Sequence, residues 1–490
     1  MVILGVGETS SNAVTAGRGY EGHSRSRNWA IGSLFWYTFR MQEVCNVNEE
    51  QGLHHQLTAG QMAMVAVGGS IGTGLLLGSA SAIGLAGPAV ILSFLLAAFI
   101  NFTVACALGE LACAHPAAGS FGVYGDLYLN DWAGFLSRGG YWAAIAVSIG
   151  AEMVASAVYM AHWFPKVPAI VWVALFSLLL LLVNLLDVGD YGRFEFWFAM
   201  VKVVTIAAFV VLGAALLLSG RVAPQYTAQG GFFPLGVLAP FLAMTFAIYA
   251  FGGIEFVAVS SGEARSPHEI AKATRITFAL LTVIYLGAMA VLVGVMPWNR
   301  AGVSESPFVT VFRSVSIPGA SHLMNFVVLT AALSGANAAL YVSSRMLVSM
   351  ARTGWATARL GQLNARGSPK LAVLVSSYGI VVALVLERWS PRSAFEFILR
   401  AAFFGMMLSW IVSLAAHVSF RRRSSPEEIG ALPLRSPRGM AGSVVGFTVI
   451  CAVILKGWYD SHVNLISGVL YLLLLTVAWW LIKQVRAKAS

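Results

Sequence analysis

Apolar runs long enough to cross a bilayer follow one another along most of the chain. A helix needs about 20 consecutive apolar residues to cross the hydrocarbon core. We count about twelve such runs, at 61–85, 88–112, 133–161, 168–187, 194–219, 236–262, 275–297, 321–351, 370–387, 394–420, 440–458 and 463–483. Only 11% of the residues are charged, against about 25% in soluble domains. The sequence therefore predicts an all-α polytopic membrane protein.

The first run is interrupted by residues 68–74, Gly-Gly-Ser-Ile-Gly-Thr-Gly. Each backbone polar group left bare in lipid costs several kcal/mol, so a break at this depth must face protein or a small aqueous cavity. Freed amides of the second half-helix carry the positive end of a dipole, and freed carbonyls of the first half carry the negative end. The break is therefore a candidate site for a zwitterion. The alternative is a close helix crossing, which the spacing of Gly68 and Gly72 also permits.

The sixth run contains a second break, Phe251-Gly252-Gly253. Matching positions of the two breaks predict two five-helix repeats of opposite topology, about 61–219 and 236–420, with the substrate site between the breaks. The last two runs, about 440–483, lie outside the repeats. A kink at a glycine pair is the alternative for this break alone. Phe246, Tyr249 and Phe251 line or adjoin it, and one of them is a candidate for closing the cavity over substrate.

The net charge of +10 does not indicate a nucleic-acid partner, because most basic residues lie in short loops between apolar runs. Inner loops hold roughly twice as many Lys and Arg as outer loops, which predicts cytoplasmic termini. We expect a disordered cytoplasmic tail at 1–55, with Met41 a candidate true start, and the transmembrane domain at 56–487. The sequence contains no CxxC pair or His cluster, so we expect no metal, no other cofactor and no structural disulfide.

Few ionisable residues lie within the predicted spans, where a charge costs roughly 2.5–3.5 kcal/mol even on a lenient scale. Lys202 is a candidate to take the place of a sodium ion and carry the driving proton; the alternative is a lysine that snorkels to the inner face. Glu152 lies in the middle of the third run, where it serves either substrate and coupling or a hydrogen bond to a neighbouring helix. Glu255 follows the second break by two residues, where the helix dipole favours its charge and where it could face a substrate amine or a proton.

Other polar residues in the spans have different expected uses. Glu110 and Glu263 lie at the inner ends of their helices, where gate ion pairs or loop anchors are expected. For the uncharged amides we expect interhelical hydrogen bonds; these residues are Asn101, Asn184 and Asn337.

Five ordered motifs occur at residues 68–75 with 77–79, 115–121, 195–199 with Lys202, 251–255 with 262–264, and 332–337 with 344–346. Together they resemble the bacterial amino acid permease branch of the amino acid/polyamine/organocation superfamily, from about residue 51 to the C-terminus. The resemblance implies a LeuT-like fold of twelve helices, with helices 1 and 6 broken, in the cytoplasmic (inner) membrane. It also implies proton-coupled uptake, with an amino acid, protons and the lipid bilayer as partners.

The resemblance also implies roles for individual residues. The amides that would hold the substrate carboxylate are those of Ser70, Ile71, Gly72, Thr73 and Gly74. The substrate ammonium would be held by carbonyls near Val67 and Gly68 and by those of Tyr249, Ala250 and Phe251, with Gly253 and Glu255 completing the substrate site. Lys202 matches a fifth-helix lysine thought to replace sodium in proton-coupled relatives.

Two features depart from the pattern of this branch. Arg138-Gly139-Gly140 stands where an aromatic, uncharged start of the third helix is expected, and the long N-terminal tail has no counterpart. Members of the branch take neutral, aromatic, basic or γ-amino substrates on nearly the same motifs, so the substrate stays open.

The leading hypothesis is a proton-driven amino acid importer that works by alternating access. The alternatives are an amino acid exchanger without net proton coupling and, from another class, a membrane amino acid sensor. An enzyme is disfavoured because no nucleophile and base or metal set recurs at usable spacing. A channel is disfavoured because the sequence has no repeated charged pore residues.

Overall fold

The computed structural model describes residues 57–117, 119–185, 191–302, 305–314, 319–364, 368–390, 393–460 and 462–489. The chain divides into a unit of residues 1–46 and a unit of residues 47–490, and all described residues belong to the second. The predicted tail at 1–55 and the candidate start at Met41 therefore lie outside the described residues.

The described residues are helical and contain no strand; Leu57 and Ala264 form an isolated parallel bridge. The first half holds α2 (Ala59–Ser70), α3 (Thr73–Leu76), α4 (Gly78–Ala86), α5 (Val90–Ala114), α6 (Ser120–Tyr128), α7 (Asp131–Ala161), α8 (Ala169–Leu185) and α9 (Tyr191–Leu218). The second half holds α10 (Ala239–Leu242), α11 (Met244–Ala250), α12 (Phe256–Val259), α13 (Pro267–Val295), α14 (Pro307–Ser314), α15 (Ala320–Arg352), α16 (Lys370–Ser376), α17 (Tyr378–Trp389) and α18 (Ala394–Arg423). The chain ends with α19 (Pro426–Gly430), α20 (Met440–Asp460) and α21 (His462–Ala489).

Nine stretches of the described chain are long and apolar enough to cross a membrane. Three predicted runs fall short as single helices: the first and sixth, which are broken, and the fourth, where α8 has 17 residues. The all-α, polytopic fold class with broken helices 1 and 6 is thereby confirmed.

Both breaks lie where the glycines predict them. The first helix stops at Ser70 and resumes at Thr73, leaving Ile71 and Gly72 outside helical geometry. The sixth helix stops at Ala250 and resumes at Phe256, with Gly253 at φ +108°.

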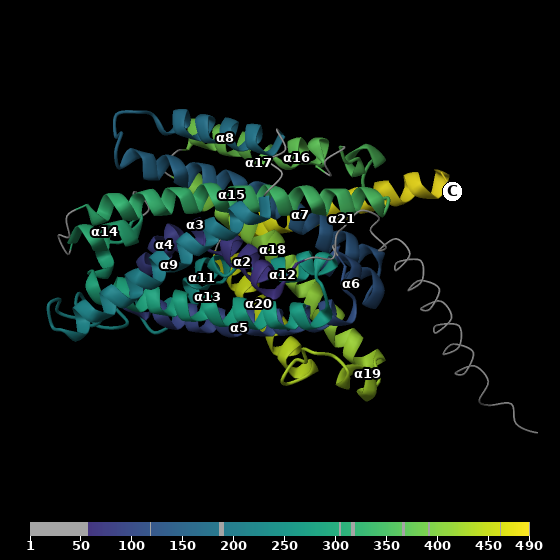
Figure 1. The fold of residues 1–490 in the computed structure, drawn as a ribbon, viewed down its shortest axis with the longest axis horizontal. Coiled ribbons are helices and arrows are strands. Elements are labelled where there is room, and N and C mark those ends of the chain that lie inside the picture. Colours follow the sequence, from purple (N-terminus) through teal and green to yellow (C-terminus); the bar gives the residue numbers. More distant parts are fainter. Residues whose placement is uncertain are drawn as a thin grey trace, which may run out of the picture. The chain divides into compact units, whose positions relative to one another are not determined.

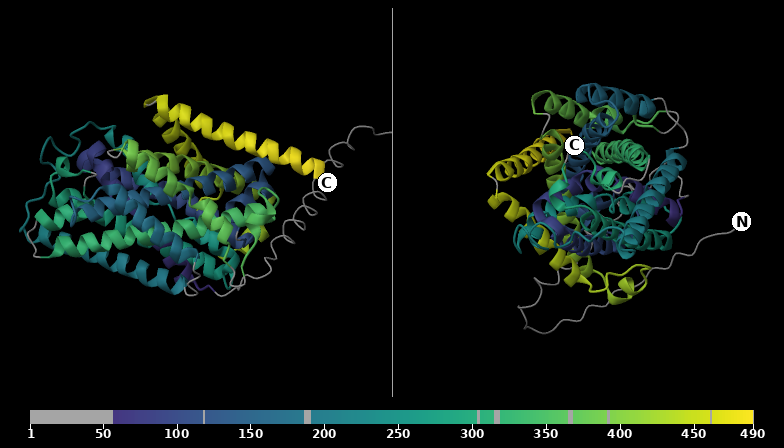
Figure 2. Two further views of the ribbon diagram at one scale, coloured as in Figure 1. Left: turned by 90° about the horizontal axis from the view of Figure 1, so that it is seen from above. Right: turned by 90° about the vertical axis from the view of Figure 1, so that its left-hand side faces the viewer.

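The broken helices form the centre of the unit. The first half-helix, α2, packs against α9, α12, α13 and α15, and the second halves α3 and α4 pack against α11. The two longest helices, α7 and α15, pack along each other, and α18 packs against α7. On one flank α8, α16 and α17 lie together (Figure 1). The C-terminal α21 runs along the outside beside α20 (Figure 2) and exposes many leucines, as a lipid-facing helix would.

Hydrogen bonds of the buried amides differ from one residue to the next. Asn184 of α8 donates to Asn337 Oδ1 of α15 at 2.8 Å, an interhelical bond as expected. Asn101 instead donates to the Ala97 carbonyl of its own helix, one turn earlier, at 2.8 Å. The interhelical expectation is therefore wrong for the Asn101 amide nitrogen, because the carbonyl of Ala97 is within its reach.

Gly253→Ala is expected to destabilise the fold. A side chain at φ +108° is strained, and its Cβ would lie 2.5 Å from Ser70 Oγ and 2.8 Å from Ser70 N. We expect a loss of at least about 1–3 kcal/mol, measured as a lower thermal midpoint of the purified protein in detergent. Gly60→Ala is the matched control, because a Cβ there meets nothing within 4 Å. Equal midpoints for the two variants would show that the second break tolerates a side chain.

Candidate substrate and coupling site

The two breaks lie against each other at the centre of the unit. A Cβ on Gly74 would lie 3.1 Å from Ala250 Cα, and one on Gly253 would lie 3.0 Å from Ser70 Cα. Such distances leave no room for a side chain between the two backbones, so glycine is what permits the approach. The structure therefore brings together the two segments, 67–74 and 249–255, that the sequence predicted to bind substrate.

Several backbone groups of the first break are bonded within the chain. Ile71 N donates to Val67 O at 2.8 Å and Gly72 N donates to Ser70 O at 2.9 Å. Ser70 O also accepts from Tyr285 Oη of α13 at 2.7 Å. In this conformation the amides of Ile71 and Gly72 donate to carbonyls of the chain and are not available to a substrate carboxylate. Fewer of the predicted amides can therefore bind it.

The amide of Thr73 is bonded to a side chain. It donates to Glu152 Oε1 of α7 at 3.3 Å. Glu152 is 8% exposed, and its carboxylate fits between two glycines, since a Cβ on Gly72 would lie 2.6 Å from Oε1 and one on Gly335 3.1 Å from it. A carboxylate of the protein therefore stands at an amide expected to hold the carboxylate of the substrate.

Lys202 reaches the first break from α9. Its Nζ donates to the carbonyl of Gly68, in the last turn of α2, at 2.7 Å, and the residue is 2% exposed. The positive charge of Lys202 also attracts the negative charge of Glu152. The lysine is therefore buried on the broken helix and does not snorkel to the inner face.

Glu255 is turned toward α7. Its Oε1 accepts from Tyr141 Oη at 2.8 Å, and its Oε2 accepts from Gly253 N at 3.1 Å. These bonds connect the second break to the third membrane helix. In this conformation Glu255 stabilises the break itself.

The aromatic residues near the second break have separate environments. Phe251 packs into a buried cluster with Phe94 and Tyr285, at ring-centroid distances of 6.3 and 4.8 Å. Tyr249 lies beside the first break, where a Cβ on Gly74 would be 3.1 Å from its ring. Phe246 faces another cavity, described below. Of the predicted aromatic residues, Tyr249 is therefore the best placed to contact a substrate at the breaks. Tyr285, which packs on Phe251 and donates to Ser70 O, was not predicted from the sequence.

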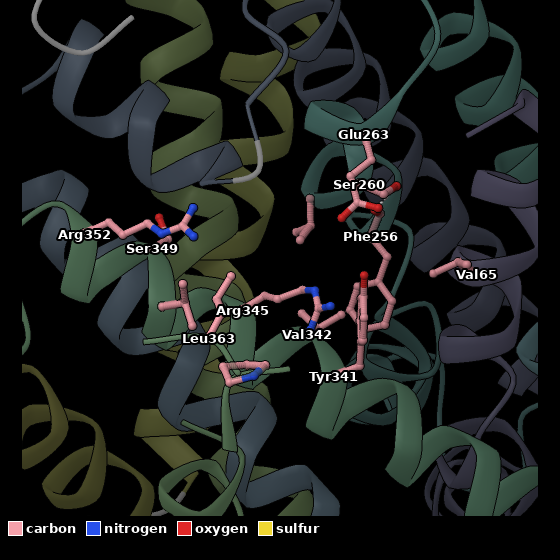
Figure 3. Close-up of a pocket in the computed structure, with 13 residues that line it drawn as sticks. Val65, Phe256, Ser260, Glu263, Tyr341, Val342, Arg345, Ser349, Arg352 and Leu363 are labelled. Carbon is pink, nitrogen blue, oxygen red and sulfur yellow. Dashed lines mark hydrogen bonds between the residues drawn. The ribbon is translucent and has the colours of Figure 1, made fainter. Parts of the chain in front are cut away.

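A cavity of about 90 Å³ opens beside α12 and α15, and Glu263 lines it. Figure 3 shows Glu263 and Ser260 on one side and Tyr341 and Arg345 of α15 on the other. The Arg345 guanidinium stacks on the Tyr341 ring, 3.8 Å from its centroid. Glu263 thus shares a cavity with Arg345, which lies in one of the five sequence motifs. The gate or anchor role expected of Glu263 stays a prediction.

Glu110 is fully buried at the end of α5. Arg421 Nε lies 2.6 Å from Oε1, His417 Nε2 lies 3.2 Å from Oε2, and Ser436 N donates to Oε2 at 2.6 Å. These partners belong to α18 and to the segment before α20. Of the two uses considered for Glu110, the geometry matches that of an anchor for this segment.

Arg138, the departure noted in the sequence, also has a partner. Its Nη2 lies 2.6 Å from Asp126 Oδ2 of α6. Asp126 lies on α6, a buried helix in the connection between the second and third predicted runs. The pair fixes this helix against the start of α7.

Comparisons of the sequence with known proteins show the family of the chain. Residues 61–489 match the family model described as amino acid permease. The uncharacterized amino acid permease YtnA of Bacillus subtilis (strain 168) is 35% identical over 442 residues, which cover 88% of this chain and 96% of YtnA. The aromatic amino acid transport protein AroP of Escherichia coli (strain K12) is 37% identical over 372 residues, which cover 75% of this chain and 81% of AroP. The chain therefore belongs to the amino acid permease family: it is an integral inner-membrane protein for amino acid transport, and not an enzyme.

Proposed function

We propose that this permease imports amino acids by proton symport and alternating access, with both termini in the cytoplasm. The observation that carries the proposal is the bond from Lys202 Nζ to the Gly68 carbonyl. A lysine there supplies the positive charge that a bound sodium ion would otherwise supply to the broken helix. Unlike arginine, lysine releases its proton when burial disfavours the charged form.

Proton release from Lys202 changes what holds the broken helix. The charged ammonium donates a hydrogen bond to Gly68 O and attracts the carboxylate of Glu152. Loss of the proton weakens both interactions, because a hydrogen bond from a charged donor is roughly twice as strong as a neutral one. The end of α2 is then free to move against α9, and this motion is the coupling step of the proposal.

The substrate takes the position of Glu152 at the first break. Its carboxylate binds the amides of Thr73 and Gly74, and Glu152 leaves Thr73 N to face the substrate ammonium. Support for this exchange comes from the Glu152–Thr73 bond of 3.3 Å, which places a carboxylate on that amide. Carbonyls of the two breaks complete the ammonium site.

Support for two inverted repeats, at about 61–219 and 236–420, comes from matching helices. The third helix of each repeat, α7 and α15, is the longest of its half, with 31 and 33 residues, and the two pack along each other. Each also contributes to the site, through Glu152 and Gly335. Repeats of opposite topology place such helices symmetrically around a central substrate.

Glu152→Gln is expected to raise the KM for amino acid uptake on the order of 10- to 100-fold, the equivalent of about 1.5–3 kcal/mol for a hydrogen bond to a charged group. Glutamine still accepts from Thr73 N, so the fold is kept while the charge toward the ammonium is lost. Initial rates of uptake against substrate concentration measure the change. Glu387→Gln is the control, because Glu387 is buried in α17 and lies outside the breaks. An unchanged KM would exclude Glu152 from the ammonium site.

Uptake of radiolabelled amino acids into proteoliposomes, with and without an inward proton gradient, tests the function. Aromatic amino acids are tested first, because the relative AroP is named an aromatic amino acid transport protein. Accumulation against a concentration gradient only when the proton gradient is present supports symport. Uptake that instead requires amino acid preloaded inside would establish the exchanger, and binding without flux would establish the sensor.

A further inference from the structure

A second cavity, of about 300 Å³, is separate from the cavity that Glu263 lines. Its walls are α4, α11, α18 and the segment at 301–302, and its residues include Ser81, Leu85, Phe246, Ala301, Glu396 and Arg400. In the proposed orientation, α4 and α11 belong to the outer halves of the two broken helices. The cavity is therefore on the side from which substrate would enter.

Opposite charges face this cavity from one helix. Glu396 and Arg400 lie one turn apart on α18. Glu396 Oε1 accepts from Ser81 Oγ at 2.7 Å, and the Arg400 guanidinium lies over the Phe246 ring, 5.5 Å from its centroid. Each charged group is thus held by an uncharged neighbour, and a ligand can exchange that neighbour for an opposite charge.

The chemistry of the walls matches an α-amino acid zwitterion. A guanidinium binds a carboxylate through two parallel hydrogen bonds, and a carboxylate binds an ammonium. Phe246, Leu85 and Ala301 supply an apolar surface for the substrate side chain. The volume lies at the lower end of the range for small-molecule sites, about 300–1,000 Å³, as a ligand the size of one amino acid requires.

We propose that this cavity is a second amino acid site, in which Arg400 binds the carboxylate and Glu396 binds the ammonium of a substrate on its way to the breaks. The proposal rests on the proposed function for the identity of the ligand and the direction of entry. An amino acid bound here contacts α4, α11 and α18 together. It thereby replaces the Glu396–Ser81 and Arg400–Phe246 contacts, which hold the outer half-helices to α18.

Binding stoichiometry of the full-length protein in nanodiscs tests this site. The probes are the twenty tritiated L-amino acids, each at saturating concentration, with bound label counted per protein. We expect two equivalents for at least one amino acid in the wild type. The Glu396→Gln and Arg400→Gln variants are each expected to bind one equivalent and to show a KM for uptake raised about tenfold. If Glu396 and Arg400 had only a structural role, the number of binding sites would not fall.

Two controls keep the result interpretable. Glutamine at 396 still accepts from Ser81 Oγ, so this variant keeps the contact between α18 and α4. Arg388→Gln removes an exposed arginine of α17, outside the cavity, and should keep two equivalents. One equivalent in the wild type and in both variants, with uptake intact, would overturn the second site and leave the proposed function standing. Absence of binding and of uptake for all twenty probes would overturn both.

Discussion

Proteoliposomes that contain Lys202→Ala are expected to lose proton-driven accumulation of amino acid. Without the ammonium at the Gly68 carbonyl, no group at this position takes up and releases a proton between the two broken-helix conformations. Internal substrate should then only equilibrate with external substrate, at the level that wild type reaches without a gradient. Exchange of internal for external amino acid should continue, because the breaks still bind the zwitterion.

Two variants separate coupling from folding in this experiment. Lys202→Arg keeps a positive charge that cannot be released, so it should exchange substrate but not accumulate it. Lys456→Ala removes a lysine near the end of α20 and should accumulate as wild type does. If Lys202→Ala accumulates as wild type does, then the lysine is structural and the proton enters elsewhere, with Glu255 and Glu152 next to be tested.

The breaks were predictable from the sequence because their cause is local. Four glycines in residues 68–74 and the pair at 252–253 weaken the helix wherever the rest of the chain lies. Matching positions of the breaks then indicated that they face each other, which the close approach of Gly253 to Ser70 confirms.

Partners of the buried charges were not predictable, because each comes from a distant segment. Glu152 binds Thr73 across 79 positions of sequence, and Glu255 binds Tyr141 across 114. Lys202 shows the same limit, since its depth in the span left both burial and snorkelling open. Only the packing of α9 on α2 decides between them.

The outer cavity shows a further limit. Glu396 and Arg400 lie near the start of an apolar run, where a charged pair at this spacing is ordinary for a helix end. Their meaning depends on Ser81 and Phe246, which come from the two broken helices. A binding site whose residues come from three helices cannot be recognised from the sequence of any one of them.

Arg138→Ala is expected to lower the stability of the permease more than any other single substitution considered above. Arg138 is 1% exposed, and its Nη2 lies 2.6 Å from Asp126 Oδ2. Breaking a buried ion pair by removing one partner costs about 3–5 kcal/mol. Asp126 has little freedom to relax, because its carboxylate packs directly on Gly134, where a Cβ would overlap it. The thermal midpoint in detergent measures the loss.

A double-mutant cycle shows whether the pair itself is responsible. Asp126→Asn leaves Arg138 as the uncompensated charge and should be destabilised to a similar degree, whereas Arg138→Leu combined with Asp126→Leu removes both charges. Because neither charge is then buried alone, the combined variant should be less destabilised than the sum of the two single leucine variants. Arg388→Ala, on the exposed surface of α17, should change the midpoint little. If the leucine substitutions are simply additive, Arg138 stabilises the permease through packing against Gly122, and the charge pair contributes nothing of its own.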